Sequence, residues 1–194
     1  EEHEILLYRS EGGVTRYAAL SAEGTEVTER TGTVGERGRT EIHDCGSPKD
    51  AAAFAQELQR WYASQGYRVW EREDDSWIVV RFPVRPEAFD EVSAVLSDEE
   101  AARRDRIAWL LNNELMETGL GRADGWEIGR CLDENDVFSL DIYCTVAEAD
   151  AGVRIIRQAL ESEGDLGKFE IAVIEPGQAD YRLVYPVAGE KDDR

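Results

Sequence analysis

Residues that commonly catalyse reactions or bind metal ions are scarce in this chain. Its two histidines are His3 and His43, so one chain cannot supply a metal site with three histidine ligands or an HExxH motif. His43 and Cys45 lie two residues apart and face the same side of an expected strand, a spacing that permits a cysteine–histidine dyad. A free cysteine just before Gly46-Ser47 is more typical of a small buried apolar residue. We therefore expect no catalytic residues, no metal site, no cofactor and no enzymatic activity.

Two further motifs match ligand-binding sequences only in part. A series of glycines has the composition of a dinucleotide loop, but it follows a helix and leads into a strand, the reverse of the order that places phosphate at a helix N-terminus. Another stretch begins like a calcium loop, yet Phe138 stands where glycine is required and Cys144 where a bidentate glutamate is required. We expect neither site. The glycines are Gly119, Gly121, Gly125 and Gly129, and the calcium-like stretch begins with Asp133, Asn135 and Val137.

Three arginines around a glycine-bounded turn are the best candidates for holding an anionic group. Arg30, Arg37 and Arg39 lie near Gly35 and Gly38, which suit a tight turn because glycine accepts positive φ. Glutamates are interleaved among the arginines, so solvated ion pairs are the alternative interpretation. These glutamates are Glu29, Glu36 and Glu41.

The elements that position these residues begin with strands and one helix. Short apolar runs and turn glycines predict strands at 5–8, 17–20, 26–33 and 39–45, then a helix that Ser47 caps and Gly66 ends, then a strand at 67–70. Phe54, Leu58 and Trp61 are expected to anchor the core of this half. Trp61 and Tyr62 lie about 100° apart on the helix, so one can point inward and the other outward as a docking residue. We take Tyr62 as a candidate binding residue.

The glycines of the first half follow a recognisable order. Gly24-Thr25-Glu26-Val27 precedes a strand, the run 31–39 carries Gly32, Gly35 and Gly38, Gly46-Ser47 opens the helix and Gly66-Tyr67 closes it. Together these features resemble a WGR domain over about residues 4–70. Thr31 stands where the family has Trp and Thr33 where it has Arg, so only Gly32 of the name-giving tripeptide is present.

The resemblance implies a fold more directly than a function. In the DNA-damage-activated poly(ADP-ribose) polymerases, a WGR domain contacts DNA and the neighbouring catalytic domain, and the Trp and Arg make part of that contact. Without that aromatic face and guanidinium, the chain lacks the side chains best suited to nucleic-acid ends. We expect the fold to be shared and do not assume DNA binding.

The second half predicts a different α+β arrangement. The acidic residues 73–75 are the expected linker, and a buried strand follows at 77–82. We then expect a short helix at 86–96, a helix from a Ser97/Glu100 capping box to Thr118, and a hairpin of 125–131 with 137–144. A helix capped by Thr145 and Glu148 and ended by Gly164 should follow, with strands at 169–174 and 181–184. Without the extra helix and the final strand, this order is that of a ferredoxin-like split βαβ fold. The expected domains are 1–72 (WGR-like), 76–188 (ferredoxin-like) and an acidic tail at 189–194.

Charge and composition narrow the function. The net charge is -20, with 16 acidic and 9 basic residues in 1–75 and 26 and 13 in 76–194, so neither half attracts phosphate backbones or anionic membranes. An odd cysteine count of 3, the absence of a long apolar run and an acidic start predict a soluble cytoplasmic protein. We expect a non-catalytic binding or regulatory protein that acts on a protein partner. The alternatives are a WGR-type nucleic-acid-binding protein and an acidic, immunity-like inhibitor of a basic partner.

Overall fold

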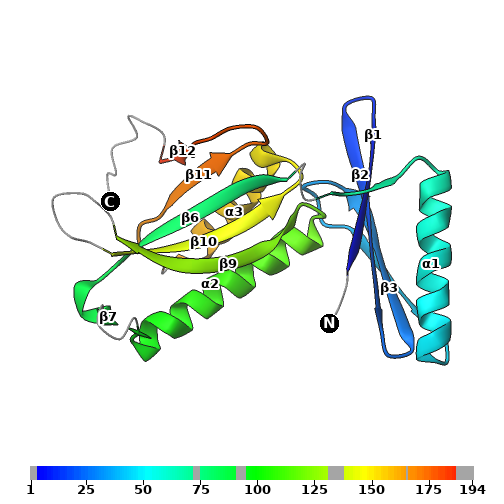
Figure 1. Cartoon of the computed structure of the whole chain (residues 1–194), viewed down its shortest axis with the longest axis horizontal. Helices are drawn as coiled ribbons and strands as arrows, with labels where there is room; N and C mark the ends of the chain where they lie inside the picture. The colour runs from blue at the N-terminus through cyan, green and yellow to red at the C-terminus, as the bar shows by residue number, and fades with distance from the viewer. Residues whose placement is uncertain (1–3, 72–74, 91–94, 131–137, 165, 187–194) are drawn as a thin grey trace. The chain divides into compact units, whose positions relative to one another are not determined.

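A computed structural model describes the chain except residues 1–3, 72–74, 91–94, 131–137, 165 and 187–194 (Figure 1). It is a mixed α/β protein with antiparallel sheets, consistent with the expected α+β class. The chain forms two compact units. The first comprises residues 1–74 and 116–120, and the second comprises 75–115 and 121–194. A five-residue segment from within the expected second domain therefore belongs to the first unit.

The first unit contains a five-stranded antiparallel sheet and one helix. The strand order is β4-β3-β2-β1-β5, and helix α1 lies along one face of the sheet (Figure 1). Ser47 caps α1 as predicted, because its hydroxyl accepts a hydrogen bond from the Asp50 N–H (3.2 Å). The elements are β1 (Ile5–Glu11), β2 (Val14–Glu23), β3 (Glu26–Thr33), β4 (Arg39–Asp44), α1 (Pro48–Ser64) and β5 (Arg68–Val69).

The core under α1 includes Leu58 as expected, whereas Phe54 is only partly buried and packs edge-on against the His43 ring (5.0 Å between centroids). Trp61 is 53% exposed and Tyr62 only 5%, so the prediction that Trp61 anchors the core is wrong and Tyr62 is not an exposed docking residue. Tyr62 packs with Leu7, Ala18 and Leu20 of the sheet. Both residues are aromatic, but Tyr62 also carries a hydroxyl. That hydroxyl donates a hydrogen bond to Glu29 on β3, which favours burial of Tyr62 against the sheet.

The second unit also contains a five-stranded antiparallel sheet. Its strand order is β12-β11-β6-β10-β9. Both long helices pack on the same face of this sheet, since Arg103 of α2 lies over the Phe82 ring (5.1 Å) and Gly152 of α3 lies against Ile78. The elements are β6 (Ser76–Val84), α2 (Asp98–Glu117), β9 (Gly121–Arg130), β10 (Phe138–Val146), α3 (Ala149–Glu163), β11 (Glu170–Ile174) and β12 (Arg182–Tyr185).

The helix expected at 86–96 is wrong. A short 3-10 helix, Pro86–Ala88, is followed by two paired strands, β7 (Phe89–Asp90) and β8 (Val95–Leu96). The Phe89 ring packs edge-on against Phe138 (4.7 Å between centroids), so pairing and packing override a helical apolar pattern.

The two predicted helix caps of this half form only in part. The Ser97 hydroxyl accepts the Glu100 N–H (3.3 Å), but the Glu100 carboxylate binds Arg103 (2.6 Å) instead of returning to Ser97. Thr145 lies inside β10 and is buried, and Glu148 occupies the N-cap of α3 without a capping hydrogen bond, so the Thr145 cap is wrong. Within the described residues, no helix is long and apolar enough to cross a membrane.

Candidate functional site

The most extensive polar site of the first unit holds the main-chain carbonyls of residues 116–119. We call its donors, Tyr8, Tyr17, Arg30, Gly35 and Gly38, the carbonyl-binding site. The Tyr8 hydroxyl donates to the Gly119 carbonyl (2.5 Å), and the Gly35 N–H donates to that of Thr118 (2.9 Å). The Glu117 carbonyl accepts from the Tyr17 hydroxyl (2.9 Å) and the Gly38 N–H (3.2 Å). Arg30 donates to the Met116 carbonyl (3.2 Å), so four consecutive carbonyls are satisfied.

Two of these carbonyls, those of Met116 and Glu117, belong to the last turn of helix α2, and the other two follow it directly. The last carbonyls of an α-helix have no partner within the helix and carry the negative end of its dipole. A guanidinium, two phenols and two main-chain amides supply what the helix end lacks. Arg37 adds an ion pair with the Glu117 carboxylate. These donors therefore bind main-chain carbonyls of the chain itself, within the first unit.

The fully buried ring of Tyr17 is the centre of this site. Burial raises the pKa of Tyr17 above its usual value of 10.0, so its phenol stays a hydrogen-bond donor. A Cβ at Gly38 would lie 2.2 Å from the Tyr17 hydroxyl oxygen, and one at Gly119 would lie 2.2 Å from the ring. Gly35 has positive φ as expected (85°), whereas Gly38 does not and is required for space. The expectation that Gly38 serves a positive-φ turn is therefore wrong.

The candidate residues from the sequence are distributed over both faces of the sheet. Arg30 faces residues 116–119 and also lies 3.6 Å from a Glu4 carboxylate oxygen. Arg39 pairs with Thr31, one residue along β3, and therefore points to the opposite face, where it contacts Glu41 (2.9 Å). Arg30 and Arg37 thus meet the same segment, and Arg39 does not join them. Sequence reasoning missed Tyr8 and Tyr17, whose cross-strand pairing was the available signal.

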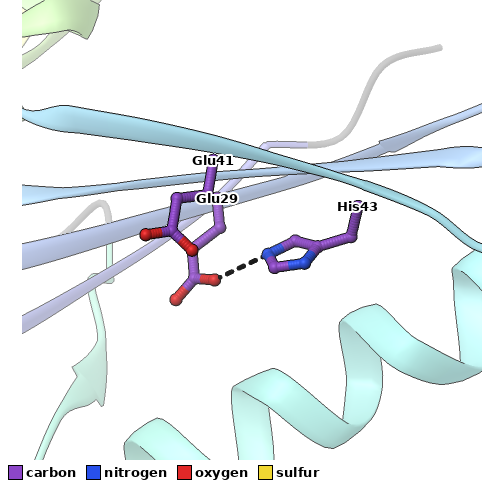
Figure 2. A group of neighbouring side chains, drawn as sticks. All are labelled: Glu29, Glu41 and His43. Atoms are coloured by element: carbon purple, nitrogen blue, oxygen red, sulfur yellow. Dashed lines mark hydrogen bonds and ion pairs between the residues drawn. The ribbon is translucent and has the colours of Figure 1, made fainter.

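A second polar group lies on the α1 face of the same sheet (Figure 2). Glu29 on β3 and Glu41 on β4 are direct cross-strand partners, and His43 lies two residues beyond Glu41 on the same face. We call these three residues the acid–histidine cluster. The His43 Nε2 atom lies 3.0 Å from a Glu29 carboxylate oxygen. The Cys45 thiol instead contacts the His43 main-chain carbonyl (3.7 Å), so the ring and the thiol do not form the dyad that their spacing permits.

The second unit carries its own polar group on the sheet face opposite the helices. Arg81 donates two hydrogen bonds to the Asp141 carboxylate (2.9 and 2.7 Å), and Tyr143 donates to Glu127. On the helix-covered face, burial raises the pKa of Cys144 to about 12. That thiol therefore stays protonated at neutral pH, which makes it a poor nucleophile.

Alkaline pH should weaken the second unit through Tyr143. Burial, the hydrogen bond to Glu127 and the charges of Glu127 and Asp141 raise the pKa of Tyr143 above its ordinary 10.0. The unfolded chain then loses this proton first, so the free energy of unfolding falls as pH rises above about 10. Tyr143→Phe should make that fall shallower in urea unfolding followed from pH 9 to 11. An unchanged slope would show that Tyr143 ionises equally in both states.

No family model, no curated protein and no solved structure matches this chain. The resemblance to a WGR domain therefore stays a prediction.

Proposed function

We propose that this protein is a non-catalytic binding or regulatory protein that acts through protein contacts. The observation that carries the proposal is the carbonyl-binding site. The glycine turn and two of the three candidate arginines, the parts of the chain best suited to an anion, engage polypeptide carbonyls and the Glu117 side chain. A net charge of -20 adds repulsion against phosphate and favours a partner with a basic surface.

The architecture supports the same proposal. The four-stranded meander of the first unit, followed by a helix and a short strand, supports the proposed WGR-like fold. In the second unit the strand order β11-β6-β10-β9, with both helices on one face, supports a ferredoxin-like fold extended by β12 as part of the proposal. Both folds serve in binding modules, and the described buried cysteine offers no nucleophile.

The purified full-length chain should not retain duplex DNA or single-stranded RNA at about 0.15 M salt, because its net charge of -20 repels the phosphates. Affinity capture from native lysate should retain a protein that, once purified, binds the chain directly in a calorimetric titration. For the nucleic-acid measurement, the comparison variant replaces Arg30, Arg37 and Arg39 together by Gln. Micromolar nucleic-acid binding that this variant loses would overturn the proposal and favour a nucleic-acid-binding protein.

A further inference from the structure

We propose that the acid–histidine cluster binds one divalent first-row transition-metal ion of the zinc class. One carboxylate oxygen each from Glu29 and Glu41 and one ring nitrogen of His43 lie within 4.8 Å of one another. Figure 2 shows the three side chains on the same side of the strands, toward α1. The proposal assigns a ligand to a part of the molecule that the carbonyl-binding site does not use, and it is independent of the proposed function.

The backbone already brings the three ligands together. Direct pairing of Glu29 with Glu41 fixes their starting points on adjacent strands, and the pleat places His43 next along the same face. Zinc bonds to nitrogen and oxygen are about 2.0–2.2 Å long, so tetrahedral ligand atoms lie roughly 3.5 Å apart. The 3.0 Å separation of His43 Nε2 from the Glu29 oxygen is close to this spacing. All three ligand atoms lie within 4.8 Å of one another, and rotation of the Glu41 side chain can bring its oxygen to the same spacing.

Charge also favours a cation at this position. Carboxylates directly opposite each other on neighbouring strands repel, and Glu29 is only 14% exposed, so water screens it poorly. A divalent ion would neutralise both charges. Arg39 offsets Glu41 at present, but its side chain is largely exposed and can move away at little cost.

The surrounding side chains suit a metal ligand set. The Tyr62 hydroxyl donates to the second oxygen of Glu29, which orients that carboxylate as the outer partners of metal ligands do. Glu41 is 44% exposed, so an ion can reach the cluster from solvent. An imidazole nitrogen with two carboxylate oxygens favours zinc, cobalt or nickel over magnesium and calcium, which prefer oxygen alone. Three protein ligands leave a fourth position for water.

Isothermal titration of the full-length chain with Zn²⁺ tests the site. We expect one ion per chain, and His43→Gln and Glu41→Gln should each raise Kd by about tenfold or more. Two control variants, His3→Gln and Cys45→Ser, should leave Kd unchanged because they remove the other histidine and the nearest thiol. The metal-free variants should keep the wild-type thermal midpoint.

A measurement on the wild-type chain covers the case in which a variant is unstable. With two histidines in the chain, Zn²⁺ should shift the ring resonances of His43 and leave those of His3 in place. No binding, binding lost only in a control variant, or a shift of His3 alone would overturn the proposal. Binding of Mg²⁺ or Ca²⁺ as tight as that of Zn²⁺ would overturn the transition-metal assignment.

Discussion

Replacing Gly119 by Ala should destabilise the first unit by about 2 to 5 kcal/mol. Gly119 has a φ of 63°, which strains any residue with a side chain by about 1–2 kcal/mol. Its added Cβ would lie 2.2 to 2.5 Å from three ring atoms of Tyr17, a fully buried side chain that has no room to withdraw. Overpacking of this kind adds about 1 to 3 kcal/mol. Hydrogen exchange of the Gly35 and Gly38 amides reports the loss directly, since both donate to the segment that Gly119 ends.

The matched control for this substitution is Gly24→Ala. Gly24 has almost the same φ, 56°, but nothing lies within 4 Å of its added Cβ. Gly24→Ala should lower the free energy of unfolding by about 1–2 kcal/mol, because it introduces the positive-φ strain without a steric clash. If the two variants have equal urea midpoints and the Gly35 and Gly38 amides stay protected in both, Tyr17 does not pack against Gly119 and the carbonyl-binding site is wrongly assigned.

The second large effect should follow from Arg81→Met. The Asp141 side chain is 4% exposed and Arg81 is 45% exposed, so removing the guanidinium leaves a buried carboxylate without its charged partner. Breaking such pairs costs about 3–5 kcal/mol when both groups are buried, and the exposure of Arg81 lowers our expectation to about 2–4 kcal/mol. Urea unfolding with hydrogen exchange of β6 and β10 measures the loss. The free energy of unfolding of Arg81→Lys should lie between those of the wild type and Arg81→Met, because an ammonium keeps the charge but cannot reproduce the two-point contact.

A double substitution separates the lost pair from the stranded charge. Adding Asp141→Leu to Arg81→Met removes the buried carboxylate and should restore at least half of the stability, as replacing both partners of a buried pair often does. Arg85→Met is the control, because Arg85 and Glu99 form an exposed pair at 3.8 Å and such pairs contribute about 0–1 kcal/mol. A double variant less stable than Arg81→Met would mean that Asp141 has a further essential partner.

Much of the fold could be predicted from signals that act within one turn of chain. Ser47, Pro48 and Asp50 start α1 through contacts among themselves, and Gly119 ends α2 with the positive φ that its position after the helix predicts. What the sequence did not show is that Gly119 lies against Tyr17, because nothing local links residues so far apart. Which of Trp61 and Tyr62 is buried is equally hard to predict from local sequence, because the hydrogen-bond partner of Tyr62 is Glu29 on a different element.

The candidate sites could be predicted only in part for related reasons. Counting histidines excludes sites rich in histidine, but it overlooks His43 with two carboxylates. The predicted strands at 26–33 and 39–45 both form, and it is their register that places Glu29 opposite Glu41. Arg30 and Arg37 were found because charged residues beside glycines are visible in sequence. Their partners are main-chain carbonyls, which no residue type reveals.

The membership of residues 116–120 in the first unit has a consequence for synthesis on the ribosome. Domains generally fold from the N-terminus as the chain emerges. Here the first unit lacks its final piece until residues 116–120 leave the exit tunnel, which happens only after residues 75–115 have left it. Until then the tyrosines and turn amides that hold the segment face water.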